Sequence, residues 1–117
     1  MTGAHTLDRM ADHARVVQGV WVDDVQAGDW VVIHTKNSVY ALVALGDGRF
    51  LVAGGWFASH DAETTPVRVL GCTWGGRAIL TGVLAAPGMF IEFGNGVHTT
   101  RIREVRLIRR HATALPH

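Results

Sequence analysis

Two dipeptides, Asp47-Gly48 and Asn95-Gly96, lie between apolar segments and constrain the fold more than any other feature of this sequence. Aspartate or asparagine followed by glycine is typical of type I′ turns, because both central residues of such a turn take a positive φ. We therefore expect one hairpin that pairs residues 38–45 with 49–53. A second hairpin is expected to pair residues 89–93 with 97–100. Branched and aromatic residues dominate both, as they do in strands generally.

Further apolar runs predict strands at residues 30–35, 67–73, 78–84 and 105–109. The apolar positions change parity between Ile102 and Val105, so we expect a bulge or a 3₁₀ turn near Arg103-Glu104. Residues 58–66 lack apolar periodicity and are predicted to form a surface loop.

The N-terminal region is the one part that suggests a helix. Thr6 is a candidate N-cap for this helix and Gly19 a candidate stop. The apolar residues between them follow i, i+3, i+4 spacing: Leu7, Met10, Ala11, Ala14 and Val17. The valines from Val16 to Val22 could equally begin a strand, so both readings of this overlap stay open.

A chain of 117 residues with 48% apolar residues is long enough for one domain with its own core and too short for two. Fourteen glycines at turn positions favour an all-β, mainly antiparallel fold, either a small SH3-like or Sm-like barrel or a β-roll. The expected domain has an N-terminal arm or short helix over residues 1–20 and a β core over 28–109. A loose tail over residues 112–117 is expected to follow.

Several of the expected strands are apolar on both faces, although a half-exposed antiparallel strand alternates apolar and polar residues. In residues 39–45 neither face is polar. A small barrel has one interior, so the other face needs the N-terminal helix, folded loops or a second copy of the chain to cover it. Our first hypothesis is therefore a non-enzymatic homo-oligomer that serves as a binding or scaffold module for an unknown ligand, with another protein as a possible partner. The candidate interface residues are Trp56, Trp74, Tyr40 and Leu42, whereas Trp21 and Trp30 either fill the core or face outward.

Catalytic signals are weak. Ser59-His60-Asp61 contains the residue types of a hydrolase triad, but consecutive residues cannot face one another in the order that the chemistry needs. Cys72 lies within an apolar strand, where a desolvated thiol is protonated and inert. His34, His60 and His98 lack the paired spacing of zinc ligands. We therefore expect no enzyme activity, metal or cofactor. The opposite case, a metal-dependent protein or enzyme built on these three histidines, remains as the third hypothesis.

Arginines suggest a second hypothesis, a nucleic-acid-binding small barrel. Residues 98–111 carry five arginines against one glutamate, although the net charge of the chain is only +1. Arginines at alternate strand positions could contact phosphates, but the aromatic residues that stack on bases are missing from this segment. The candidate anion-binding residues are Arg101, Arg103, Arg106 and Arg109, with Arg77 beside a glycine turn that could form a backbone nest.

The longest weakly polar stretch, residues 78–91, is shorter than the roughly 20 residues of a spanning helix. The N-terminal residues lack the pattern of a secretory signal, and a lone cysteine cannot form a disulfide within its own chain. We therefore expect a cytoplasmic protein that is not inserted in a membrane.

Four segments carry a resemblance to known sequences: His34–Tyr40, Val52–Phe57, Gly71–Ala78, and Glu92-Phe93 with the following Thr99–Ile102. Together they resemble a group of small uncharacterised bacterial β-domain proteins, over about residues 28 to 109. The resemblance implies a compact bacterial β domain and implies no substrate. The SH3-like or Sm-like architecture is an analogy at the level of the fold.

Overall fold

The computed structural model describes residues 2–110, with side chains from Thr6 onward. The helices are α1 (Thr2–Val16), the 3₁₀ helix η1 (Val22–Asp24) and α2 (Gly55–Ser59). The strands are β1 (Val20–Trp21), β2 (Trp30–Thr35), β3 (Val39–Gly46), β4 (Arg49–Ala53), β5 (Val67–Thr73), β6 (Val83–Ala85), β7 (Phe90–Phe93) and β8 (Ile102–Ile108). The expected tail at residues 112–117 lies outside the described residues.

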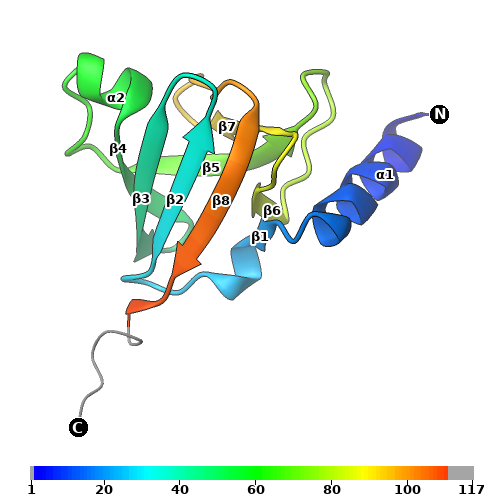
Figure 1. Ribbon diagram of the computed structural model, residues 1–117, viewed down its shortest axis with the longest axis horizontal. Coiled ribbons are helices and arrows are strands. Elements are labelled where there is room, and N and C mark those ends of the chain that lie inside the picture. Colours follow the sequence, from blue (N-terminus) through cyan, green and yellow to red (C-terminus); the bar gives the residue numbers. More distant parts are fainter. Residues whose placement is uncertain (1, 111–117) are drawn as a thin grey trace, which may run out of the picture.

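The strands form an antiparallel fold of two sheets. One sheet has six strands in the order β7-β5-β4-β3-β2-β8, and the other pairs β1 with β6. In Figure 1, β3, β2 and β8 form the nearer layer, β5 and β7 cross behind it, and α1 lies to one side beyond β6. This arrangement confirms the mainly antiparallel β class and the N-terminal helix.

The long sheet bends at β5, which pairs with β4 at its first two residues and with β7 over Val69–Thr73. The bend brings the start of β7 back toward β8. The amide of Gly88 donates to the carbonyl of Ile102, and the amide of Ile102 donates to Met89, each at 2.8 Å. These bonds join one end of β8 to the chain before β7, but the described strands do not form a closed barrel.

Side chains on the inner face of this sheet form one core. Fully buried residues alternate along the strands, as the period of two in a strand requires. They include Val31 and Ile33 from β2, Leu42 from β3, Val52 from β4, and Ile91 and Phe93 from β7. Phe57 of α2 joins this core, where its ring lies edge to face with that of Phe93 at 5.0 Å.

The two predicted hairpin turns differ in outcome. Asp47 and Gly48 have φ values of 57° and 73°, so both are positive, as a two-residue type I′ turn requires. At the second turn only Gly96 has a positive φ, and the amide of Phe93 donates to the carbonyl of Val97 across three residues. The expectation of a type I′ turn at Asn95-Gly96 is therefore wrong. The Asn95 side chain accepts from the amide of Val97 instead, which stabilises the longer turn.

Several element boundaries differ from those expected. The helix α1 begins at Thr2, so Thr6 lies inside it and is not its N-cap. The expected loop at 58–66 starts later, because Ala58 and Ser59 end the helix α2. The expected strand at 78–84 is reduced to an isolated bridge at Leu80 and the short strand β6. The strand expected at 105–109 begins three residues earlier, at Ile102.

The predicted irregularity in the last strand is confirmed. His34 pairs with Glu104 and Thr35 with Ile102, so Arg103 is the extra residue of a bulge. This insertion keeps the side chain of Ile102 buried although its parity differs from that of Val105.

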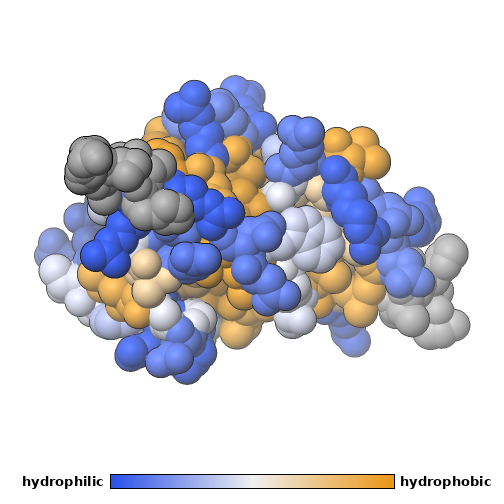
Figure 2. Space-filling view, turned by 90° about the horizontal axis from the view of Figure 1, so that it is seen from below, coloured by the Kyte–Doolittle hydropathy of each residue, from blue (hydrophilic) through white to orange (hydrophobic). Residues whose placement is uncertain are grey.

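The end of the molecule that lies below in Figure 1 shows hydrophobic residues in separate areas between hydrophilic ones (Figure 2).

Candidate functional site

The side of the sheet that faces away from the core carries an apolar row across four strands. Leu51 of β4 pairs with Val43 of β3, Val43 pairs with Trp30 of β2, and Trp30 pairs with Ile108 of β8. Directly opposite residues point to the same face of an antiparallel sheet. These four side chains therefore lie side by side on the outer side of the sheet.

The next row on this side is Ala53, Ala41, Val32 and Arg106. It is apolar over three strands and charged only on β8, where Arg106 forms an exposed ion pair with Glu104 at 3.4 Å. We call the outer side of β4, β3, β2 and β8 the outer face. In Figure 1 the β3, β2 and β8 part of it is turned toward the viewer.

The outer face is open to solvent within the described chain. Trp30 is 44% exposed, Val39 is 52% exposed and Ile108 is 43% exposed. These values confirm the expectation that the strands are apolar on both sides. Two residues predicted to lie in the interface, Tyr40 and Leu42, are not on this face. They have the opposite parity along β3 and are buried in the core, so their assignment to an interface is wrong.

A hollow of about 180 Å³ lies in the outer face. Two small residues that are directly opposite one another, Ala41 and Ala53, leave space beside the larger side chains of the row that contains Trp30, Val43 and Leu51. One ionisable group, the carboxylate of Glu63, also lines it. Glu63 is held in place because its Oε2 accepts from the amide of Gly54 at 2.8 Å.

The two tryptophans proposed for an interface lie elsewhere. Trp56 is in α2, where its ring stacks on that of His60 with centroids 4.1 Å apart. Trp74 follows β5, and its ring makes a T-shaped contact with the His13 ring of α1, with the centroids 5.6 Å apart. Both are 37% exposed, so both are partly covered by their own chain. Trp21 is half-buried and packs against the core.

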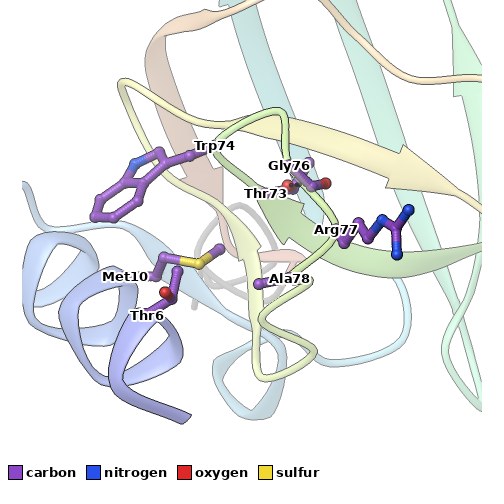
Figure 3. A pocket seen from close by; sticks show the side chains of 7 residues that line it. All are labelled: Thr6, Met10, Thr73, Trp74, Gly76, Arg77 and Ala78. Carbon is purple, nitrogen blue, oxygen red and sulfur yellow. Dashed lines mark hydrogen bonds between the residues drawn. The ribbon is translucent and has the colours of Figure 1, made fainter. Parts of the chain in front are cut away.

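A larger cavity of about 340 Å³ lies between α1 and the loop after β5 (Figure 3). Thr6 and Met10 of α1 line one side, and the Trp74 ring lies above them. The guanidinium of Arg77 extends away from the helix, so its stem rather than its charge lines the space. The described side chains that line this cavity present mainly apolar groups and threonine hydroxyls. This lining does not point to a particular reaction.

The arginines of the last strand do not lie in one stripe. Arg101 precedes β8, with its guanidinium over the Phe90 ring at 5.0 Å and one N–H donated to the carbonyl of Gly88. Arg106 lies on the outer face, and Arg103 is at the bulge. Arg109 bonds to the carboxylate of Asp29 and to the carbonyl of Asp24. Three of these four guanidinium groups are thus bound to groups of the protein itself, because Arg106 is also paired with Glu104.

Asp29 is a buried residue that connects the chain around two adjacent strands, β2 and β8. Its carboxylate accepts from the amides of Gln26 and Arg110, both at 2.9 Å, and from Arg109 at 3.2 Å. These bonds join the turn before β2 to the chain after β8. The two amides, more than burial or Arg109, set the pKa of Asp29, which is lowered from its ordinary value of 3.8.

We expect Asp29 to stabilise the fold above its ordinary pKa, and this contribution to be lost as the pH falls through its lower pKa in the folded state. In Asp29→Asn no carboxylate is present, so that part of the acid-induced loss is absent. Urea unfolding between neutral pH and about pH 3 measures the difference, because the free energy of the wild type falls more steeply than that of the variant. Parallel curves would contradict this role.

Cys72 is fully buried, as expected for a structural cysteine, and its thiol donates to the carbonyl of Leu84 at 3.3 Å. Burial raises the pKa of Cys72 to about 12.

Because the thiolate is the reactive form, we expect Cys72 in the folded protein to resist an aromatic disulfide reagent at neutral pH. The same thiol should react after unfolding in urea, which serves as the control. Rapid reaction without denaturant would show that the thiol is accessible.

The described residues include no group of three or more histidine, cysteine or acidic side chains placed to bind a metal ion. Ser59 Oγ lies 3.1 Å from Nδ1 of His60, but the same nitrogen lies 2.8 Å from the carbonyl of Trp56. A hydrolase triad needs the serine at one ring nitrogen and a carboxylate at the other. Here the serine and the carbonyl share one nitrogen, an arrangement that does not activate the hydroxyl.

No helix among the described residues is long and apolar enough to cross a membrane. Among the features described above, the outer face combines exposed apolar side chains with a hollow. No protein-family model, curated protein or solved structure matches this chain.

Proposed function

We propose that this chain is a non-enzymatic cytoplasmic β module that associates with itself through the outer face. The observation that carries the proposal is the unbroken apolar row formed by Leu51, Val43, Trp30 and Ile108. The largest apolar patch on the surface of a soluble protein is often a site at which a partner binds. A second copy of the same chain is the simplest partner, since a two-fold interface uses one surface twice.

The size of the outer face supports a weak dimer. Four strands at a spacing of about 4.8 Å, and about 20 Å of β3 from Val39 to Leu45, give a few hundred square ångströms. A standard stable interface buries about 800 Å² on each partner. We therefore expect a dimer that dissociates in the micromolar range and that could serve as a reversible scaffold.

The proposal includes an SH3-like or Sm-like small-barrel architecture. Its support is the short antiparallel strands, the bend at β5, and the two hydrogen bonds that connect Ile102 with the chain before β7. A surface formed by a curved sheet keeps its shape when a partner binds. That rigidity would favour a defined dimer over non-specific aggregation.

One pair of variants tests self-association. Ile108 and Leu70 are isomeric residues with exposed fractions of 43% and 44%, and each follows an arginine by two positions. Ile108 lies on the outer face, whereas Leu70 lies on β5 outside it. We expect Ile108→Glu to convert the dimer into a monomer, because the interface would bury an unpaired charge.

The matched control Leu70→Glu adds the same charge at the same exposure and should leave the dimer intact. Size-exclusion chromatography with light scattering, at one protein concentration, gives the mass of each variant. Dissociation by both variants, or by neither, would argue against the outer face as the interface.

A further inference from the structure

The hollow in the outer face has the size and the lining to accept one large aromatic side chain. Its volume of about 180 Å³ is several times the roughly 30 Å³ that one water molecule occupies in the liquid. Ala41 and Ala53 form its floor, and Val43, Leu51 and Trp30 add apolar walls. Apolar hollows gain most when a complementary apolar group excludes water from them.

Trp30 is the large side chain that the same surface offers. It begins β2, is 44% exposed, and lies between Val43 and Ile108 in the apolar row. The hollow and the protruding ring are therefore on one face, and Trp30 also forms part of the wall of the hollow. In a two-fold interface each surface meets its own copy, so a ring beside a hollow can be complementary to itself.

Glu63 supplies the polar contact that a buried indole needs. The Nε1–H of a tryptophan usually finds an acceptor when the ring is buried. Glu63 lines the hollow, and a carboxylate has acceptor sites beyond the one that Oε2 uses for the amide of Gly54. An aliphatic side chain in the hollow would leave this carboxylate without a new partner, so the lining favours an indole.

From these observations we propose that Trp30 of each copy inserts into the hollow between Ala41 and Ala53 of the second copy, with its indole N–H directed at Glu63. This inference rests on the proposed self-association and specifies its central contact. Tryptophans in such pockets are frequent hot spots of interfaces, where truncation weakens binding by about thirtyfold.

Two variants test the insertion from its two sides. Trp30→Ala removes the ring, and with it one wall of the hollow, but leaves the space over Ala41 and Ala53 free, whereas Ala41→Phe fills this space and keeps the ring. A homodimer of either variant loses both insertions, so it should form several hundredfold more weakly than the wild type, on the order of thirtyfold for each insertion lost. Trp74→Ala, which removes an indole outside the outer face, is the control and should leave the dimer unchanged. Circular dichroism verifies that all three variants fold.

Mixing the two weakened variants gives the decisive result. In a heterodimer, the Trp30 ring of the Ala41→Phe chain can enter the free hollow of the Trp30→Ala chain. The hollow that the new phenylalanine fills then faces the alanine at position 30 of the other chain. We expect native mass spectrometry of the mixture to show a heterodimer more abundant than either homodimer. No heterodimer would overturn the insertion.

The outcomes separate the two proposals. A wild-type dimer that Ile108→Glu dissociates, but that Trp30→Ala and Ala41→Phe leave unchanged, would overturn the insertion and keep the proposed self-association. A monomeric wild type would overturn both.

Discussion

Replacing Phe57 with alanine is expected to lower the free energy of unfolding by about 4 kcal/mol. Phe57 is fully buried, and its ring lies edge to face with Phe93 at 5.0 Å and with Trp56 at 5.3 Å. Alanine would lose the transfer free energy of the ring and leave a cavity between α2 and β7. The short helix α2 depends on this contact, because five residues are too few for a helix that is stable alone.

The neighbouring residue provides the control. Trp56 is larger than Phe57 but 37% exposed, so Trp56→Ala should cost less than about 2 kcal/mol. Urea unfolding followed by circular dichroism measures both values. Equal losses would show that α2 does not anchor the fold through Phe57.

The second large effect is expected at Gly54, where alanine should cost about 3 kcal/mol. Gly54 has a φ of 98°, and a Cβ there would overlap the carbonyl oxygen of Val39. Both the backbone conformation and the close approach of β3 therefore require glycine. The same residue donates its amide to Glu63, so strain at this position would also move the rim of the hollow.

Gly96→Ala separates these two causes. Gly96 has a similar φ of 87°, but no described atom beyond its two chain neighbours lies within 4 Å of the added Cβ. We expect a cost of about 1 kcal/mol there, which is the backbone part alone. Thermal or urea unfolding compares the two variants. If both lose the same stability, the contact between Gly54 and Val39 is not tight in solution.

Much of the sheet could be predicted because its signals are local. The bounds of β2 and β5 agree with those expected, and the turn at Asp47-Gly48 has the predicted conformation. The turn at Asn95-Gly96 differs although its sequence is nearly equivalent. There the amide of Gly94 donates to the carbonyl of Arg68 on β5, so a contact distant in sequence selects the longer turn.

The outer face shows where local reasoning reaches its limit. The presence of a second apolar face was predicted, but Tyr40 and Leu42 were assigned to the wrong side of β3. Alternation gives no direction when both parities are apolar, so only the pairing with β2 decides which side is buried. His34 carried a usable signal, because this polar residue shares its parity with Trp30 and Val32 and marks the outer side.

The molar mass of the 117-residue chain in solution tests the role of the outer face most directly. Sedimentation equilibrium over a series of micromolar concentrations gives that mass without a variant or a label. If the apolar row is an interface, the mean mass rises from 12.7 kDa toward twice this value as the concentration increases. A mass that stays at 12.7 kDa throughout the series would contradict self-association through this face.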